Sequence, residues 1–142
     1  MDQNFQNHFR IVKGYHILLT VLLLSGLVGS IFNLASSIKN ENLYSASLIV
    51  LLFVIGFFIA VFSRSFALKA QDRAIRAEES FRYYLLTGKT LPLNLNMTQI
   101  IALRFAPDNE FQSLSERASV ENLNAKEIKS AIKNWKADHH RV

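Results

Sequence analysis

The stretch GYHILLTVLLLSGLVGSIFNLASSIKNENLYSASLIVLLFVIGFFIAVF, residues 14–62, decides the fold. It holds two apolar runs, residues 15–35 and 43–63, in which Asp, Glu, Lys and Arg do not occur. Each run has about the 20 residues that a helix needs to cross roughly 30 Å of hydrocarbon at 1.5 Å per residue. Residues 36–42 are left as a short turn, so we predict an all-α membrane protein built on a two-helix transmembrane hairpin.

Two other interpretations of the apolar runs are weaker. Two core helices of a soluble protein would need a covering layer, and the remaining sequence is too short and too polar to cover helices that are apolar all round. A cleaved signal peptide has a shorter apolar core than residues 15–35, and Asn33, Leu34 and Ala35 do not form its small-x-small cleavage site. We therefore expect an uncleaved first span.

The basic residues around the runs predict the orientation. Lys39 is the only basic residue of the turn, and the formal net charge of the chain is +5. Because Lys and Arg near span ends stay in the cytoplasm, we expect both termini there and the turn outside. The basic residues outside the turn and nearest the spans are Arg10, Lys13, Arg64, Lys69, Arg73 and Arg76. The last four are candidate contacts to the anionic headgroups of the lipid bilayer.

The second apolar helix is expected to leave the membrane unbroken. Nothing interrupts its helical pattern until Gly88, where a left-handed cap is expected, with Pro92 shortly after. Residues 64–88 would then form a cytoplasmic helical stalk. One stripe of that stalk carries residues at spacings of three and four, namely Ala67, Ala70, Ala74, Ala77, Phe81 and Tyr84. Acid-before-base pairs at four residues, such as Glu78 with Arg82, would support the helix.

We predict that residues 89–142 form a small cytoplasmic domain of about three short helices, and that residues 1–14 form a cytoplasmic N-terminal segment. Capping pairs begin two of these helices, Asn96 with Gln99 and Asn124 with Glu127, and Pro107 with Asp108 begins the middle one. The last helix is expected to carry Ile128, Ile132 and Trp135 on one stripe and Lys126, Lys129, Lys133 and Lys136 on another. So small a core needs the stalk or a second copy to complete it.

Small residues mark the expected contact between the spans, because membrane helices associate through close backbone approach. Gly26 and Ser30 share a face of the first span, and Gly56 and Ala60 share a face of the second. In an antiparallel hairpin, residues at equal depth have numbers that sum to about 78, which pairs Gly26 with Leu52 and Gly56 with Leu22. The alternative is that one small face makes an oligomer; the short turn favours packing within the chain.

Three stretches carry a family resemblance: ALKAQDRAIRAEE at residues 67–79, LRFA at 103–106 and EIKSAIKNWKAD at 127–138. Together with His8, the pair Tyr15 and His16, and the terminal Arg141 and Val142, they resemble an uncharacterised family of small bacterial membrane proteins, a domain of unknown function. The likeness covers nearly the whole chain. It implies a bacterial two-span protein, and it brings no catalytic residues. We expect such a protein in the inner membrane.

The residue types give no catalytic, cofactor or metal site. The chain has no cysteine, and neither span holds an ionisable residue at mid-depth, as proton relays and ion pathways require. His139 and His140 are neighbours, so on a helix they diverge and cannot share one ion. The Lys stripe of the last helix is compatible with a solvated face, with lipid headgroups or, least well, with nucleic acid.

Function is predicted only as a class. We expect a non-enzymatic membrane anchor or scaffold whose basic helical tail binds an unidentified protein or a second copy of the chain. The alternatives are a pore-forming, holin-like hairpin and a membrane-tethered nucleic-acid binder. A pore would need little folded mass after the spans, which the capped, Trp-containing tail opposes.

Overall fold

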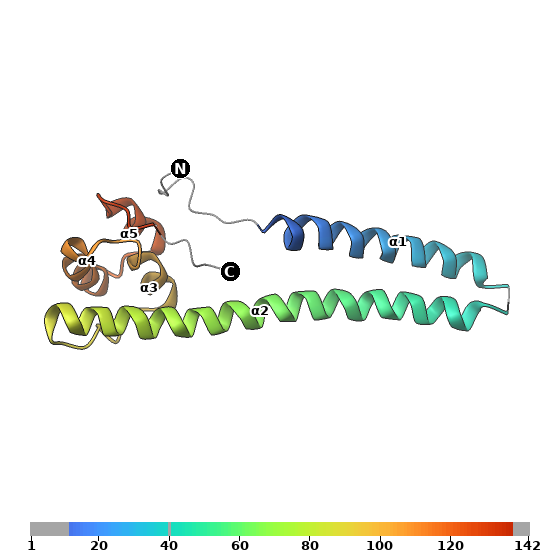
Figure 1. The fold of residues 1–142 in the computed structure, drawn as a ribbon, viewed down its shortest axis with the longest axis horizontal. Coiled ribbons are helices and arrows are strands. Elements are labelled where there is room, and N and C mark those ends of the chain that lie inside the picture. Colours follow the sequence, from blue (N-terminus) through green and yellow to red (C-terminus); the bar gives the residue numbers. More distant parts are fainter. Residues whose placement is uncertain (1–11, 40, 138–142) are drawn as a thin grey trace. The chain divides into compact units, whose positions relative to one another are not determined.

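The structure, a computed structural model, describes residues 12–39 and 41–137. Within these ranges all regular secondary structure is helical, which confirms the predicted all-α class. In chain order the elements are the π-helix η1 (Gly14–Leu19), α1 (Thr20–Ser37), α2 (Leu43–Thr87), α3 (Met97–Leu103), α4 (Asp108–Glu121) and α5 (Ala125–Ala131) (Figure 1). The described residues form two compact units, the hairpin unit (residues 12–67) and the tail unit (residues 68–137), and α2 contributes to both.

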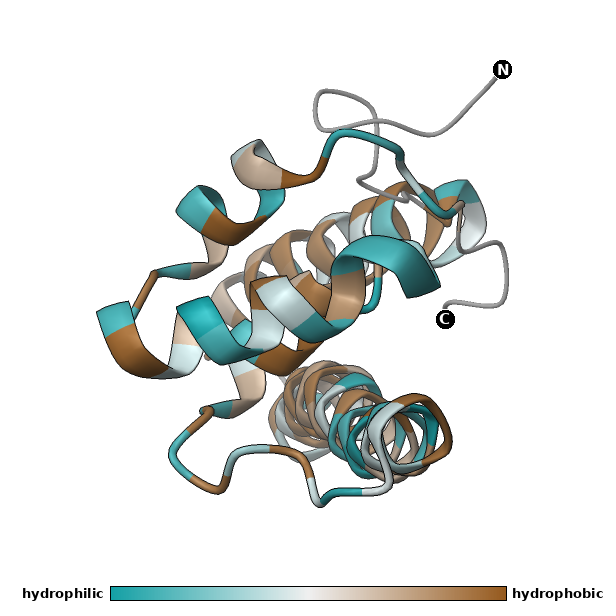
Figure 2. Ribbon diagram, turned by 90° about the vertical axis from the view of Figure 1, so that its left-hand side faces the viewer, coloured by the Kyte–Doolittle hydropathy of each residue, from teal (hydrophilic) through white to brown (hydrophobic). Residues whose placement is uncertain are grey.

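The hairpin unit consists of η1 with α1 and the first part of α2. The helical segment Gly14–Ser37 has 24 residues, and it and α2 are both long and apolar enough to cross a membrane. It begins one residue before the expected span and ends two residues after it. The outward side chains are apolar, with Phe32 70% exposed and Leu52 66% exposed, and Figure 2 shows apolar residues along successive turns of α1. Such uncovered apolar helices are compatible with a lipid surrounding.

The end of α2 has the left-handed cap that the sequence predicts. Gly88 has a φ of 68°, and glycine adopts this left-handed conformation at little cost because it has no Cβ. Its N–H donates to the carbonyl of Tyr84 at 2.8 Å. The hydroxyl of Thr87 donates to the carbonyl of Tyr83 at 2.8 Å. Two of the last carbonyls of the helix are therefore satisfied where the chain turns toward α3.

The short helices begin at the predicted residues. Asn96 accepts from the N–H of Gln99 at 3.0 Å while the Gln99 side chain accepts from the N–H of Asn96 at 2.7 Å, which is a complete capping box. Asn124 and Glu127 form the same box at the start of α5. Pro107 is the N-cap of α4. The capping signals thus located all three helices.

A single core holds the tail unit together. Its buried apolar residues come from α3, α4, α5, their connections and one face of α2: Ile75, Tyr83, Leu91, Leu95, Ile100, Ala102, Leu103, Phe105, Ala106, Phe111, Leu114, Ala118, Ile128 and Ile132. Phe105 is fully buried, and its ring centroid lies 4.9 Å from that of the half-buried Trp135. Ile75 and Tyr83 belong to α2, so the short helices complete their core against that helix.

The last helix is shorter than predicted. α5 ends at Ala131 and Ile132 is extended, so Trp135, Lys133 and Lys136 lie beyond the helix. The expected Lys stripe, which needs all four residues on one helix, is therefore wrong. Tertiary contacts override the helical pattern here, because Glu110 accepts from the N–H groups of Lys133 and Asn134 at 2.9 and 3.1 Å. The N–H of Lys136 donates to the carbonyl of Phe105 at 2.8 Å.

Candidate interaction surface

Gly26 lies at a close approach of the two hairpin helices. A Cβ placed on Gly26 would overlap the ring of Phe53, whereas a Cβ on Gly56 would meet Leu23 at 3.4 Å. These contacts join residues whose numbers sum to 79, so the predicted pairing with Leu52 and Leu22 is wrong by one residue. The reason is the length of α1, which continues to Ser37 instead of ending at Ala35. The turn therefore begins later in the chain, and the numbers of residues at equal depth add up to a larger sum.

The other two residues expected in this contact also face the hairpin. Ser30 is 5% exposed and its hydroxyl donates to the carbonyl of Leu27 at 2.8 Å, within its own helix. The carbonyl of Ala60 accepts a hydrogen bond from the hydroxyl of Tyr15 in η1. The sequence carries no signal for the π-helical turn that contains Tyr15.

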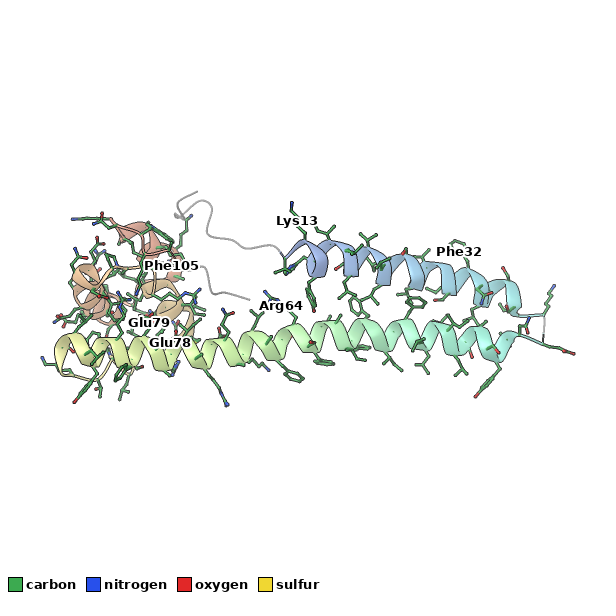
Figure 3. All side chains as sticks on the ribbon, in the orientation of Figure 1. Lys13, Phe32, Arg64, Glu78, Glu79 and Phe105 are labelled. Carbon is green, nitrogen blue, oxygen red and sulfur yellow. The ribbon has the colours of Figure 1, made fainter. Side chains whose placement is uncertain are left out.

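A cleft of about 270 Å³ opens between the helices of the hairpin unit beside Tyr15. Apolar side chains such as Leu19, Phe57 and Val61 line most of it, together with Arg64. Of the four residues expected to contact lipid headgroups, Arg64 is half-buried, and Lys69, Arg73 and Arg76 are exposed on α2 (Arg64 is labelled in Figure 3). An apolar cleft beside a guanidinium is chemically suited to an acyl chain with an anionic headgroup.

A network of charged groups fastens α2 to the short helices, and Arg82 is its centre. Its Nη1 donates to Glu79 at 3.0 Å, its Nη2 to the carbonyl of Ala106 at 2.7 Å, and its Nε to Asp108 at 2.7 Å. The guanidinium also lies 4.2 Å from the ring centroid of Phe111. All three guanidinium nitrogens are therefore engaged within the protein, which assigns Arg82 a structural role.

The sequence predicted a different acidic partner for Arg82. The expected pair was Glu78 with Arg82 at four residues, whereas the structure pairs Arg82 with Glu79 at three residues and with Asp108 at the start of α4. Glu78 is exposed and Glu79 is buried; Figure 3 labels both on α2. The correction follows from the core, because Ile75 and Tyr83 set which face of α2 turns inward, and Glu79 lies between them on that face.

Burial perturbs two titratable groups of this network. Desolvation raises the pKa of Glu79, against the opposing effect of the Arg82 guanidinium beside it. Burial, together with the nearby carboxylate of Glu116, raises the pKa of the Tyr83 hydroxyl. The Tyr83 hydroxyl donates to Glu116 at 3.3 Å, so Glu79 and Tyr83 each have a partner within the tail unit. The network joins α2 to α4 and to the segment that precedes α4.

Glu110 makes a second polar junction in the tail unit. Besides the two N–H groups already described, its carboxylate accepts from the side-chain amide of Asn134 at 2.9 Å. These hydrogen bonds, the one from the N–H of Lys133 first, lower the pKa of Glu110. Sequence spacing alone did not reveal this junction, because it joins the first turn of α4 to the segment after α5.

The opposite side of α2 in the tail unit is uncovered. Phe81 is 62% exposed, Tyr84 56% and Leu85 67%, and they extend a row of exposed alanines, Ala70, Ala74 and Ala77. We call these six residues the outward face. Counting about 100° per residue, it lies roughly opposite Ile75, Glu79 and Tyr83, which face the core. The sequence predicted this stripe but not that the short helices would pack on the other side of α2.

No group of three His, Cys, Asp or Glu side chains in residues 12–39 and 41–137 is placed to hold a metal ion. His8, His139 and His140, along with Phe5 and Phe9 of the N-terminal segment, lie outside the described residues.

The fold defines the class of this protein: an all-helical chain with two helices long and apolar enough to span a membrane, followed by three short helices. The chain belongs to the family of unknown function DUF6526, which it matches over residues 1–142. No curated protein and no solved structure matches it.

Proposed function

We propose that this protein is a membrane-anchored interaction protein, or scaffold, without enzymatic activity. The hairpin unit would anchor it in the bacterial inner membrane, with both termini in the cytoplasm, and the tail unit would present the outward face to another protein. The Lys and Arg distribution around the apolar runs supports that orientation. Arg64, Lys69, Arg73 and Arg76 would contact anionic lipid headgroups next to the second span.

The observation that carries this proposal is the outward face. The tail unit closes its core and pairs its buried charges, yet it leaves Phe81, Tyr84 and Leu85 more than half exposed on one side of a helix. Clustered exposed apolar side chains beside charged residues are typical of protein interaction sites. A tail without a binding partner would have no need of such an exposed apolar surface.

The nucleic-acid alternative loses its geometric support, because Lys133 and Lys136 lie beyond α5. A pore-forming hairpin has no specific observation in its favour, since Gly26, Ser30 and Gly56 face within the hairpin unit.

Site-specific photo-crosslinking in native membranes tests the proposal. A photoreactive residue at Phe81 of the full chain should give protein adducts, whereas one at Val120, which is 86% exposed on α4, should give few. Adducts at Phe81 that contain only lipid, or no excess over Val120, would contradict it. Collapse of the membrane potential on modest expression would favour the pore instead.

A further inference from the structure

We infer that the outward face of α2 pairs with the same face of a second copy of this chain, as a parallel two-stranded coiled coil. This inference rests on the proposed function and names its partner. It starts from the pattern of the outward face: Ala70, Ala74, Ala77, Phe81 and Tyr84 follow one another at spacings of four, three, four and three. That is the apolar a and d repeat of a coiled coil, with Ala74 and Phe81 at a and the other three at d.

The face is free to accept a second helix. All five of these residues are exposed, and the short helices of the tail unit pack on the side of α2 that carries Ile75, Glu79 and Tyr83. With about 100° per residue the centres of the two sides lie roughly 180° apart. A second α2 laid on the outward face would therefore leave the core and the Arg82 network undisturbed.

The charged residues beside the stripe favour a second copy in a definite register. In the heptad set by the stripe, Arg73 occupies a g position and Glu78 the following e position, and both are exposed. In a parallel pair, a g residue lies beside the e residue of the next heptad on the partner helix. Arg73 of each copy then faces Glu78 of the other, which gives two opposite-charge pairs by symmetry.

An antiparallel pair of the same helices loses this complementarity. It places g beside g and e beside e, so Arg73 meets Ser80 or another Arg73, and Glu78 meets Gln71 or another Glu78. Two copies inserted in one membrane with the same topology also present α2 in the same direction. Charge and anchoring therefore select the parallel arrangement.

Cysteine crosslinking of the full chain in membranes tests the orientation. The chain has no cysteine, so Ala70→Cys, Ala77→Cys and Tyr84→Cys each introduce a single thiol. A disulfide forms only where two Cα atoms come within about 7 Å. Under mild oxidation with copper phenanthroline we expect all three variants to form covalent dimers, because identical residues face one another at every level of a parallel pair.

The control is Arg76→Cys, which is exposed on the neighbouring side of the same helix and should crosslink far less. Crosslinking at Ala77 alone would mean an antiparallel pair and would overturn the inference. Crosslinking no greater than the control at all three positions would overturn self-association. In that case, adducts of a different protein at Phe81 would still support the proposed function, and their absence would contradict both.

Charge reversal in the Ala77→Cys background tests the register. Arg73→Glu or Glu78→Arg places like charges together at both symmetric pairs, so we expect the rate of dimer crosslinking to fall about fivefold. The double variant restores opposite charges and should recover the original rate. Single reversals without effect, or a double variant no better than the singles, would overturn the pairing of Arg73 with Glu78.

Discussion

Replacing Phe105 with Ala should unfold the tail unit while leaving the hairpin unit in place. The Phe105 side chain is fully buried, its ring packs on Trp135 at 4.9 Å, and the Nζ of Lys129 lies 5.6 Å from its centroid. Burial of about 150–200 Å² of aromatic surface at roughly 25 cal/mol per Å² contributes about 4–5 kcal/mol. Measured Phe-to-Ala costs of about 3–5 kcal/mol agree with this figure. A domain this small has a total stability of about the same size.

The assay is hydrogen exchange of the full chain in detergent micelles, with the fluorescence of Trp135, the only tryptophan, as a second probe. In Phe105→Ala, amides of α3, α4 and α5 should exchange at rates near those of an unfolded chain, while those of α1 keep their protection. The matched control is Leu93→Ala, which removes a large side chain that is 96% exposed. If Phe105→Ala retains the protection and Trp135 emission of the wild type, the core is not organised around Phe105 and the reasoning is refuted.

Three further predictions concern the hairpin unit, the pH dependence and the topology. Gly26→Leu should destabilise the hairpin by about 1–3 kcal/mol, because the new side chain would overlap Phe53, and the melting temperature in detergent should fall. Gly29→Leu should leave the melting temperature unchanged, because Gly29 has open space around it, and equal effects of the two substitutions would place the contact elsewhere. Glu110→Gln should lower the thermal midpoint of unfolding at pH 7. Because folding lowers the pKa of Glu110, the difference in midpoint between wild type and variant should shrink as the pH falls below 4.5, and a pH-independent difference would contradict the prediction. Reporter fusions in the turn at Asn40 should read outside and those after Val142 inside; an inside signal at Asn40 would overturn the hairpin topology.

The sequence predicted the parts of this fold that depend on local chemistry. Hydrophobic length defined the two long helices, Gly88 marked the end of α2, and the capping pairs at Asn96 and Asn124 located two short helices. Each of these signals acts over a few residues or along one uninterrupted helix. They therefore need no knowledge of which elements meet.

The errors all concern contacts between distant segments. The helical spacing continues through Ile128, Ile132 and Trp135, yet the helix ends at Ala131. The backbone after it is held instead by Glu110, which lies 23 residues before Lys133 and accepts a hydrogen bond from the Lys133 N–H. The partners of Arg82 were misassigned because the core turns Glu79 inward and because Asp108 comes from another helix. The outward face was recognised as a stripe, but its exposure depends on where the short helices pack. These outcomes are decided by tertiary contacts, which residue spacing does not encode.

The charged network explains why α2 presents that particular face outward. Both sides of the helix offer apolar surface to the short helices, Ile75 and Tyr83 on one and Phe81 and Tyr84 on the other, so hydrophobic burial alone discriminates weakly between them. A half-turn of α2 would take Arg82 away from Asp108 and the Ala106 carbonyl, and those groups would lose a charged partner. Ala106 is fully buried, so its carbonyl would be left without a hydrogen bond, and an unsatisfied buried polar group costs about 1–3 kcal/mol. The network therefore fixes the rotation of α2, and with it the exposure of the outward face.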